Sequence, residues 1–324
     1  MIPRLNIRFP IKRQWQYWFG KQYEPRQGEY LLNHARSGIV IALRVSIPNG
    51  GRVGVVAYNC HTVANAVVHA GCKPVFVDVT EDLRIDIDSL PVNLDAIIVT
   101  NLFGIRNDIA AIRKRLPKAV IIVDNAHGYG LPEEGDFTVY SINQGKFPSL
   151  GEGGILLVND EILMANEVYS NLPSYGFIAQ VKLFVQMQIK ALAYNRCIYW
   201  LTIRMKKTSN PKVNKTIVMR KMAPGIRRLF KAWLPYAREE IAKQKRNGTK
   251  IADGILGDNG FMAVLKCDYP TVLQMQYAGY GVETATHFKN AIVWAEQFGY
   301  VRGSCPKAEE LTAHLLMIPT YRAL

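Results

Sequence analysis

Apolar residues gather in short continuous runs along the first half of the chain, and helical patterns separate these runs. Runs rich in Val and Ile predict strands at 54–58, 73–78, 96–100, 119–124, 137–142 and 154–158. Between them, the spacing of apolar and small residues predicts helices at 35–45, 62–70 and 108–116. Strands without polar alternation are typically buried on both faces of a mostly parallel sheet, with helices covering it. The pattern therefore predicts an α/β domain.

The pattern changes beyond this domain. A long apolar stretch at 177–205 predicts a helix, but Lys182, Lys190 and Arg196 lie within it and argue against a membrane-spanning segment. Nearer the C-terminus, the runs FMAVLKC and LLMIP predict strands of a second, smaller α/β unit, with a helix at 271–280 between them. We expect four parts: a basic aromatic N-terminal segment (1–29), a large domain (30–175), a basic helical insertion or linker (176–250) and a small C-terminal domain (251–324).

Charge is distributed unevenly along the chain. The 324 residues carry 40 Lys and Arg against 26 Asp and Glu, which gives a formal net charge of +14. Residues 176–250 hold 18 basic and 2 acidic residues, and residues 1–26 hold 6 basic and 1 acidic residue. The remainder is mildly acidic, so two aromatic-rich basic segments stand out. Such segments attract phosphates, nucleic acid or an anionic membrane surface.

Composition and motifs exclude several classes of protein. A chain that is 49% hydrophobic and 20% charged is globular and not intrinsically disordered. The five cysteines are scattered without a CxxC pair and the histidines lack ligand spacing, so we expect no metal site and a reducing compartment. No GxGxxG follows the first strand and no GxxxxGK[ST] occurs, which argues against a dinucleotide fold and a P-loop. The N-terminus lacks the apolar core of a secretory signal peptide, so we expect a cytoplasmic protein.

Candidate chemistry lies just after the apolar runs, because ligands of open α/β sheets bind at the carboxyl ends of the strands. Lys146 lies in SINQGKFPSLGEGG, between a predicted strand and a glycine-rich turn. A single lysine is most often a surface cation, but Asp124 ends an apolar strand, where a buried carboxylate needs a cationic partner. Ser141, together with Arg36 and Ser37 at a predicted helix start, offers donors for a phosphate. Pyridoxal phosphate requires this combination of amine, carboxylate and phosphate donors.

The order of the motifs resembles that of the DegT/StrS-type sugar aminotransferases. The stretches that carry the resemblance are VAYNCHTVANAVVHAGCKPVFVDV, IIVTNLFG, VIIVDNAHGYG and YSINQGKFPSLGEGG. The resemblance implies a fold-type I pyridoxal-phosphate enzyme and a homodimer, with a large α/β domain and a smaller C-terminal α/β domain. It implies transfer of an amino group, usually from glutamate, onto a nucleotide- or lipid-linked keto sugar in polysaccharide or glycoconjugate biosynthesis.

The resemblance also assigns roles to individual residues. It implies that Lys146 forms the covalent bond to the cofactor and that Asp124 holds the pyridine nitrogen protonated. Ser141 matches the phosphate-binding serine, His127 stands where relatives usually have a glutamine near the ring, and Asn143 stands where many have histidine. Because related sugar dehydratases have histidine at the lysine position, Lys146 favours transamination.

Several positions depart from the family pattern. Cys60 stands where an aromatic residue often stacks on the cofactor, so His61 or Tyr58 is expected to supply that contact. The Asn-x-Arg-Met signature, whose asparagine reaches the phosphate of the neighbouring subunit, is MRKM at 219–222. His287, in GVETATHF, falls in a segment that approaches the active site in relatives, and with Tyr58 it is a candidate for substrate contact. These departures predict an altered substrate more than a loss of the lysine chemistry.

The basic segments allow two interpretations. They form a helical insertion that packs on the body or across a dimer, or they bind an anionic membrane at its inner face, with aromatic rings among the headgroups. The aromatic residues concerned are Trp15, Tyr17, Trp18, Phe19, Phe177, Phe184, Tyr199 and Trp200. A different class of function is a catalytically retired relative that acts as a membrane-surface or nucleic-acid-binding adaptor. No nucleic-acid motif is present, so we expect no nucleic-acid partner.

Overall fold

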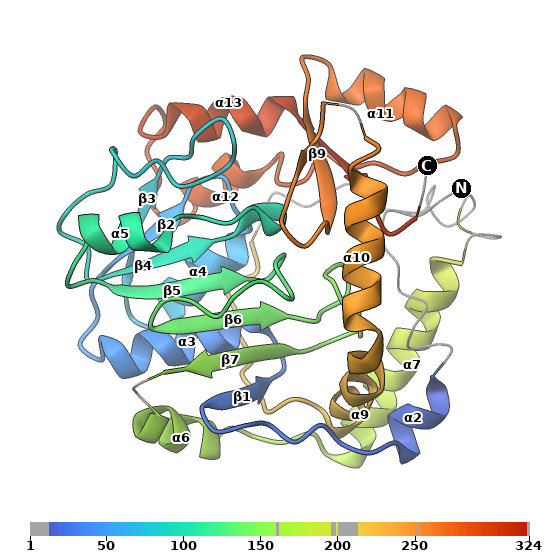
Figure 1. Cartoon of the computed structure of the whole chain (residues 1–324). Coiled ribbons are helices and arrows are strands. Elements are labelled where there is room, and N and C mark those ends of the chain that lie inside the picture. The colour runs from blue at the N-terminus through green and yellow to red at the C-terminus, as the bar shows by residue number, and fades with distance from the viewer. Residues whose placement is uncertain (1–12, 160–161, 196–198, 200–212, 252, 323–324) are drawn as a thin grey trace.

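The structure is a computed structural model that describes residues 13–159, 162–195, 199, 213–251 and 253–322 (Figure 1). Trp200 and Arg196, which belong to the basic insertion, lie outside the described residues, and so do the first twelve residues of the chain.

A seven-stranded sheet forms the centre of the molecule (Figure 1). Its strands are β1 (Glu29–Leu32), β2 (Arg52–Val56), β3 (Lys73–Val77), β4 (Ala96–Thr100), β5 (Val120–Asn125), β6 (Phe137–Ser141) and β7 (Gly154–Val158). They are ordered β1-β7-β6-β5-β4-β2-β3, and the five strands from β6 to β3 are parallel to their neighbours. Strands β7 and β1 continue the sheet in antiparallel pairs. The mostly parallel sheet predicted from the sequence is confirmed, and β1 is a strand that the apolar pattern did not indicate.

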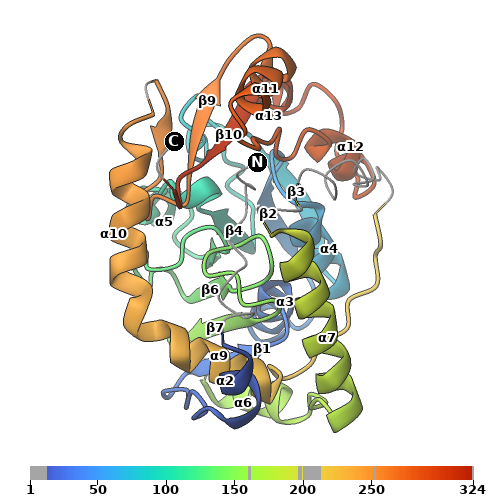
Figure 2. The same ribbon diagram turned by 90° about the vertical axis from the view of Figure 1, so that its right-hand side faces the viewer.

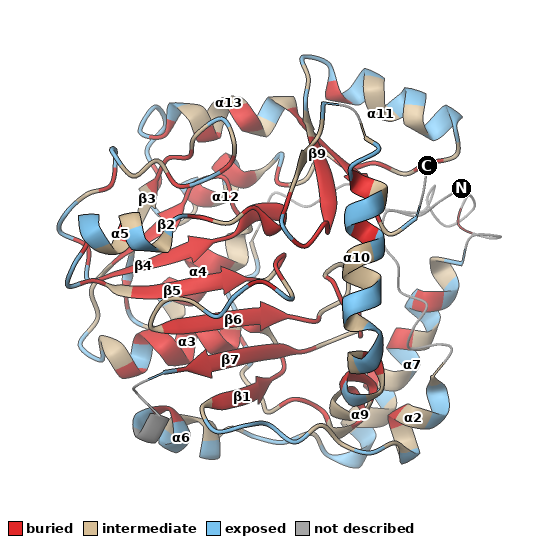
Figure 3. Cartoon of the chain, viewed as in Figure 1, coloured by how far each residue is buried: buried red, intermediate tan, exposed pale blue. Residues whose placement is uncertain are grey.

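Helices cover both faces of this sheet because its strands are apolar on both faces. Alternate residues of one strand enter different cores: Ile97 and Val99 of β4 belong to one hydrophobic cluster, and Ala96 and Ile98 belong to the other. The first cluster includes residues of α5 (Ile109–Arg115) and α9 (Pro224–Trp233), and the second those of α3 (Ala35–Ser46), α4 (His61–His69) and α6 (Ile162–Ser170). Figure 3 shows the strands buried along most of their length.

The C-terminal part forms a second, smaller sheet. It has the order β10-β9-β8 and is antiparallel throughout. Its elements are β8 (Ile255–Leu256), β9 (Met262–Lys266), α11 (Pro270–Gly279), α12 (Ala291–Glu296), α13 (Pro306–His314) and β10 (Leu315–Pro319). The strands predicted in FMAVLKC and LLMIP and the helix between them are confirmed. Helix α12 packs against α4, which joins this unit to the edge of the large sheet.

The described part of the basic insertion contains the helices α7 (Phe177–Ala193), α9 and α10 (Ala237–Gly248), and residues 213–223 before α9 are not helical. Helix α2 (Gln14–Phe19) of the N-terminal segment packs on α9, and the ring of Tyr17 lies 5.0 Å from that of Phe184 on α7. Tyr17 and Tyr199 are 1% and 0% exposed, so these two rings pack inside the protein and cannot enter a membrane. Trp15 and Phe19 are 69% and 66% exposed. None of the helices described here is long and apolar enough to cross a bilayer.

The carboxyl ends of β4, β5 and β6 point to one side of the molecule (Figure 1). Figure 2 looks onto that side, with α10 along one margin and α7 along the other. The parallel strands therefore bring their C-terminal residues together between two helices that come from the basic insertion.

Candidate active site

A cavity of about 210 Å³ lies at the carboxyl ends of β4, β5 and β6 and the N-terminus of α3. Its lining includes seven of the residues singled out in the sequence: Arg36, Cys60, Asp124, His127, Ser141, Asn143 and Lys146. These residues are up to about a hundred positions apart in the chain, and the parallel strands bring them to one edge. We call this space the lysine cavity.

Asp124, near the end of β5, is a buried carboxylate with fixed hydrogen-bond donors. The N–H of Ala126 donates to its Oδ1 at 2.9 Å, and the hydroxyl of Thr100 lies 3.4 Å from its Oδ2. The side chain of Asn59 in turn donates to the Thr100 hydroxyl oxygen at 2.9 Å. Burial raises the pKa of the Asp124 carboxyl, and the Ala126 N–H and the charge of Lys146 oppose that shift. Asp124 is thus oriented to accept a cationic partner in the cavity.

Lys146 contacts the buried ring of His127. The Nζ of Lys146 lies 2.7 Å from Nε2 of His127, and the N–H of Phe103 donates to Nδ1 of the same ring at 3.2 Å. Because Nδ1 accepts, the proton of the neutral imidazole is on Nε2, and that N–H needs a lone pair on the lysine nitrogen. Burial lowers the pKa of both side chains, that of His127 well below its ordinary value. A neutral lysine amine is the form that attacks a carbonyl.

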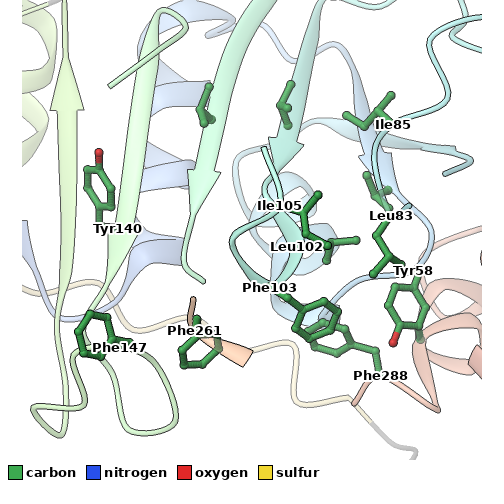
Figure 4. Close-up of a cluster of buried hydrophobic side chains, with 14 of the residues drawn as sticks. Tyr58, Leu83, Ile85, Leu102, Phe103, Ile105, Tyr140, Phe147, Phe261 and Phe288 are labelled. Carbon is green, nitrogen blue, oxygen red and sulfur yellow. The ribbon is translucent and has the colours of Figure 1, made fainter. Parts of the chain in front are cut away.

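Aromatic rings fix the orientation of His127. Its ring stacks on those of Phe103, Phe261 and Phe288, with centroids 5.2, 5.3 and 5.9 Å away and interplanar angles of 19°, 27° and 17°. Figure 4 shows Phe103 and Phe288 next to one another and Phe261 apart from them, each on a different segment of the chain. Such packing prevents the imidazole from turning away from Lys146. Phe288 also lines the lysine cavity, a position that the sequence did not reveal.

The other end of the cavity is suited to an anion. Helix α3 begins at Ala35 and no side chain caps it, although the N–H of Ser37 donates to the carbonyl of His34 at 3.1 Å. The Nε of Arg36 is buried without a hydrogen-bond partner, and burial lowers the pKa of its guanidinium. The hydroxyl of Ser141 lies at the end of β6 and is buried. A guanidinium, a hydroxyl and a helix N-terminus together fit a phosphate.

The glycine-rich turn positions this anion site. Gly154 lies so close to α3 that a Cβ there would be 2.2 Å from the carbonyl carbon of His34. Asn143 joins the two segments, because its Oδ1 accepts from the N–H of Gly153 at 2.7 Å and its Nδ2 donates to Nδ1 of His34 at 3.0 Å. The second half of GEGG therefore allows the helix N-terminus to approach the end of β6.

Two of the predicted cofactor contacts lie outside the lining of the lysine cavity. The hydroxyl of Ser37 is buried and donates to Oδ1 of Asn33 at 2.9 Å. The ring of His61 packs edge-on against Trp294, with centroids 5.0 Å apart, and burial lowers the pKa of the imidazole. In this structure both side chains contact protein groups instead.

The candidate substrate residues Tyr58 and His287 contact one another. The hydroxyl of Tyr58 donates to the backbone carbonyl of His287 at 2.8 Å, and Tyr58 is fully buried. The ring of His287 lies 6.2 Å from that of His127, the residue that contacts Lys146. No cluster of three or more metal-ligating side chains occurs in the described ranges.

The residues of the lysine cavity fit pyridoxal phosphate, the cofactor that the sequence resemblance implies. Lys146 has the neutral amine for its aldehyde, Asp124 has a buried carboxylate for its pyridine nitrogen, and Arg36 has a guanidinium nitrogen that lacks a partner. Asn59 and Thr100, which orient Asp124, were missed in the sequence. Both stand beside apolar runs at the same sheet edge, and this position is the signal that would have indicated them.

Comparisons with known proteins identify the family of this chain. A model of the DegT/DnrJ/EryC1/StrS aminotransferase family matches residues 31–217 of the chain. A pleiotropic regulatory protein of Geobacillus stearothermophilus is 25% identical over 319 residues, which cover 88% of this chain and 78% of that protein.

Solved structures share the fold over almost the whole chain. A putative sugar aminotransferase, Spr1654 from Streptococcus pneumoniae in its PMP-form, has a TM-score of 0.70 at 16% identity and covers 97% of this chain and 91% of its own. S. venezuelae DesV, in complex with a ketimine intermediate, also has a TM-score of 0.70 at 16% identity, with 97% and 88% covered. DesI in the presence of its TDP-sugar product has a TM-score of 0.68 at 16% identity, with 99% and 87% covered. The fold is thus that of fold-type I aminotransferases, and the family match over more than half of its length shows that this chain belongs to the DegT/DnrJ/EryC1/StrS aminotransferase family.

Proposed function

We propose that this protein transfers an amino group from an amino acid, with glutamate as the expected donor, to a keto sugar carried on a nucleotide or a lipid. The contact between Lys146 and His127 carries the proposal, because it leaves a neutral lysine amine in a cavity that also holds a buried carboxylate and an anion site. A structural relative supports the substrate class, since DesI was solved in the presence of its TDP-sugar product.

The residues of the cavity would have different roles in such a reaction. Asp124 would hold a protonated pyridine nitrogen, and Arg36, Ser141 and the start of α3 would hold the phosphate. Bound pyridoxal phosphate supplies an electron sink that stabilises negative charge on the carbon of the amino donor or acceptor. Lys146, as a free amine with a lowered pKa, takes the proton from that carbon and later returns it. Phe288 lines the same cavity as the reacting amine.

Two half-reactions test this proposal. Purified protein with pyridoxal phosphate should absorb in the visible range, lose that band with glutamate and recover it with an accepted keto sugar. Lys146→Ala should abolish both changes, whereas Lys118→Ala, which removes an exposed lysine far from the cavity, should leave them intact. A wild-type protein that never binds the cofactor would overturn the proposal and favour a retired relative acting as an adaptor.

A further inference from the structure

A second cavity adjoins the lysine cavity. It measures about 140 Å³ and shares His34 and Gln144 with the lysine cavity. The rest of its lining comes from the turn after Lys146 and from helix α7: Ser149, Gly151, Glu152, Leu183, Gln186, Met187 and Lys190. We call it the α7 cavity. Since α7 belongs to the basic insertion, that insertion forms one wall of a space that borders the lysine cavity.

The wall that α7 contributes is firmly docked. Leu183, Met187 and Ala191 form its buried stripe, one helical turn apart. Met187 packs on the glycine-rich turn so closely that a Cβ on Gly151 would lie 2.7 Å from its Cγ. Gly151 also has a φ of +101°, which few residues with side chains adopt. The helix and the turn therefore form a shaped surface next to the lysine cavity.

The polar groups of the α7 cavity are mixed donors and acceptors. Gln144 and Gln186 offer amides, Ser149 offers a hydroxyl and Glu152 offers a carboxyl that accepts from the hydroxyl of Tyr175. This mixture suits the hydroxyl groups of a sugar, each of which both donates and accepts hydrogen bonds. An apolar ligand would leave these groups unpaired, which is unfavourable.

Charge at the open side of the α7 cavity favours a ligand that carries an anionic group. Lys190 lines the α7 cavity from an exposed position on the helix, and its ammonium group is suited to a phosphate or carboxylate carried by the ligand. Burial raises the pKa of Glu152, and nearby cations, Lys190 among them, oppose this. The cavity therefore combines a neutral-to-acidic inner part with a basic rim.

We infer that the α7 cavity binds the hydroxyl-bearing ring of the amino acceptor, with Lys190 at the anionic part that links the sugar to its carrier. The inference rests on the proposed function, because a keto sugar whose carbonyl lies at Lys146 has to extend into an adjoining space. Another cavity that adjoins the lysine cavity, beside Asn59 and Cys60, measures only about 10 Å³ and is too small for a sugar ring.

Met187→Trp tests the inference by filling the α7 cavity. The two half-reactions are measured separately in single turnovers, with glutamate as donor and with whichever TDP-, UDP- or GDP-linked 4-keto-6-deoxyhexose the wild type accepts. We expect the variant to react with glutamate at a rate within about twofold of the wild type and with the keto sugar at least about tenfold more slowly. Because glutamate reacts at the same lysine, its retained rate also shows that the variant is folded.

Val185→Trp is the matched control, because it adds similar bulk to α7 at a residue that is 47% exposed and does not line the cavity. It should leave both half-reactions unchanged. Lys190→Ala should raise the KM for the nucleotide-linked sugar with little effect on glutamate, and Lys182→Ala on the same helix should do neither.

Three results would overturn the inference while leaving the proposed function intact. These are equal loss of both half-reactions in Met187→Trp, no loss of either, or loss of the glutamate reaction alone, which would assign the cavity to the donor. If the wild type reacts with glutamate but accepts none of the keto sugars, the sugar-acceptor part of the proposed function fails and the inference fails with it. If the wild type does not react with glutamate at all, glutamate is not the amino donor. The reaction with the keto sugar is measured separately and still tests the inference.

Discussion

At the scale of single residues, the protonation state of Lys146 is the property on which the chemistry depends. An ordinary lysine is almost fully protonated near neutral pH and is a poor nucleophile. In this protein burial lowers the pKa of Lys146, and its Nζ lies 2.7 Å from Nε2 of His127, the nitrogen that carries the proton of a neutral ring when Nδ1 accepts from Phe103. A hydrogen bond to the neutral form of a group also disfavours its charged form. His127 is therefore a positioning residue for the lysine.

Replacing His127 by leucine should raise the pKa of Lys146. The variant keeps the cavity apolar but removes the N–H that hydrogen-bonds to the neutral amine, a loss of about 1 kcal/mol or somewhat less than one pH unit. The rate at which protein without cofactor incorporates pyridoxal phosphate, measured against pH, should shift to higher pH by that amount. His127→Gln, whose amide can donate, should restore the wild-type profile. An unchanged profile in His127→Leu would contradict this role.

The same histidine should make stability depend on pH. The folded-state pKa of His127 is well below 6.5 because the ring is buried, whereas the unfolded chain titrates near 6.5. Below that pH the unfolded state binds a proton that the folded state does not, so the free energy of unfolding falls as pH decreases. The slope is about 1.4 kcal/mol per pH unit for each such histidine. His34, whose pKa burial lowers to about 4, contributes over the range between 6.5 and 4.

Urea unfolding at pH 5, 6 and 7 checks this dependence. The wild type should lose stability below pH 6.5, and His127→Gln should lose less because one buried imidazole has been removed. The difference between the two proteins should vanish above pH 7. Parallel curves for both proteins across the whole range would contradict the assignment of a neutral buried ring.

At the scale of elements, the approach of α3 to β7 builds the anion site. Gly154→Ala should push the helix N-terminus away, because the new Cβ would overlap the carbonyl carbon of His34. We expect a loss of about 1–3 kcal/mol in stability and a weaker affinity for pyridoxal phosphate. Gly176→Ala is the control, since nothing lies within 4 Å of a Cβ there. Equal cofactor affinity in the two variants, measured by titration of the visible band, would contradict the role of the glycine.

The apolar runs of the sequence were sufficient to predict most helices and strands and part of the site. The strands predicted at 96–100 and 154–158 are β4 and β7 without any shift, since continuous Val and Ile runs are buried on both faces. Strand β1 (Glu29–Leu32) was missed because it is four residues long and follows a polar segment. Short edge strands depend on pairing with a distant neighbour, here β7, which a local pattern does not contain.

Side-chain orientation is what the sequence could not supply. Tyr58 and His61 follow strand β2, as expected, yet Tyr58 points to the backbone of His287 and His61 points to Trp294. Both partners belong to the C-terminal part, more than two hundred residues away, and only tertiary packing brings them there. Motif spacing likewise could not predict the contact of Lys146 with His127, although the sequence singled out both residues.

At the scale of the whole molecule, the basic insertion and the N-terminal segment act together. Helices α2 and α7 pack through Tyr17, Trp18 and Phe184, and this contact supports the interpretation of an insertion that packs on the body. The exposed rings of Trp15, Phe19 and Phe177 remain on the outside. The described part of the chain thus combines a packed inner side with an aromatic outer side.

We expect this outer side to bind anionic membranes weakly and with a steep dependence on salt, because exposed Lys21 and Lys182 accompany the exposed rings. Sedimentation with phosphatidylserine vesicles should fall at high salt and fall further in the double variant Trp15→Ala and Phe19→Ala. Tyr280→Ala, which removes an exposed ring elsewhere, should bind like the wild type. Equal binding to neutral and anionic vesicles, or none to either, would leave packing as the role of the insertion.

The family also implies a homodimer, which stays a prediction. Light scattering of the purified protein should give twice the chain mass of 36.5 kDa. A monomer that still catalyses both half-reactions would contradict the expectation that a neighbouring subunit completes the site. An active monomer would be consistent with the MRKM segment at 219–222, which lacks the asparagine that reaches across subunits in relatives.

Borohydride reduction tests the central claim most directly, because it converts a bond between an amine and an aldehyde into one that survives digestion. Protein incubated with pyridoxal phosphate, reduced and cleaved should yield one modified peptide, with the cofactor on Lys146. Asp124→Asn should weaken the binding that precedes this bond without moving it to another residue. Cofactor fixed on several surface lysines, or none on the peptide that contains SINQGKFPSLGEGG, would contradict the account.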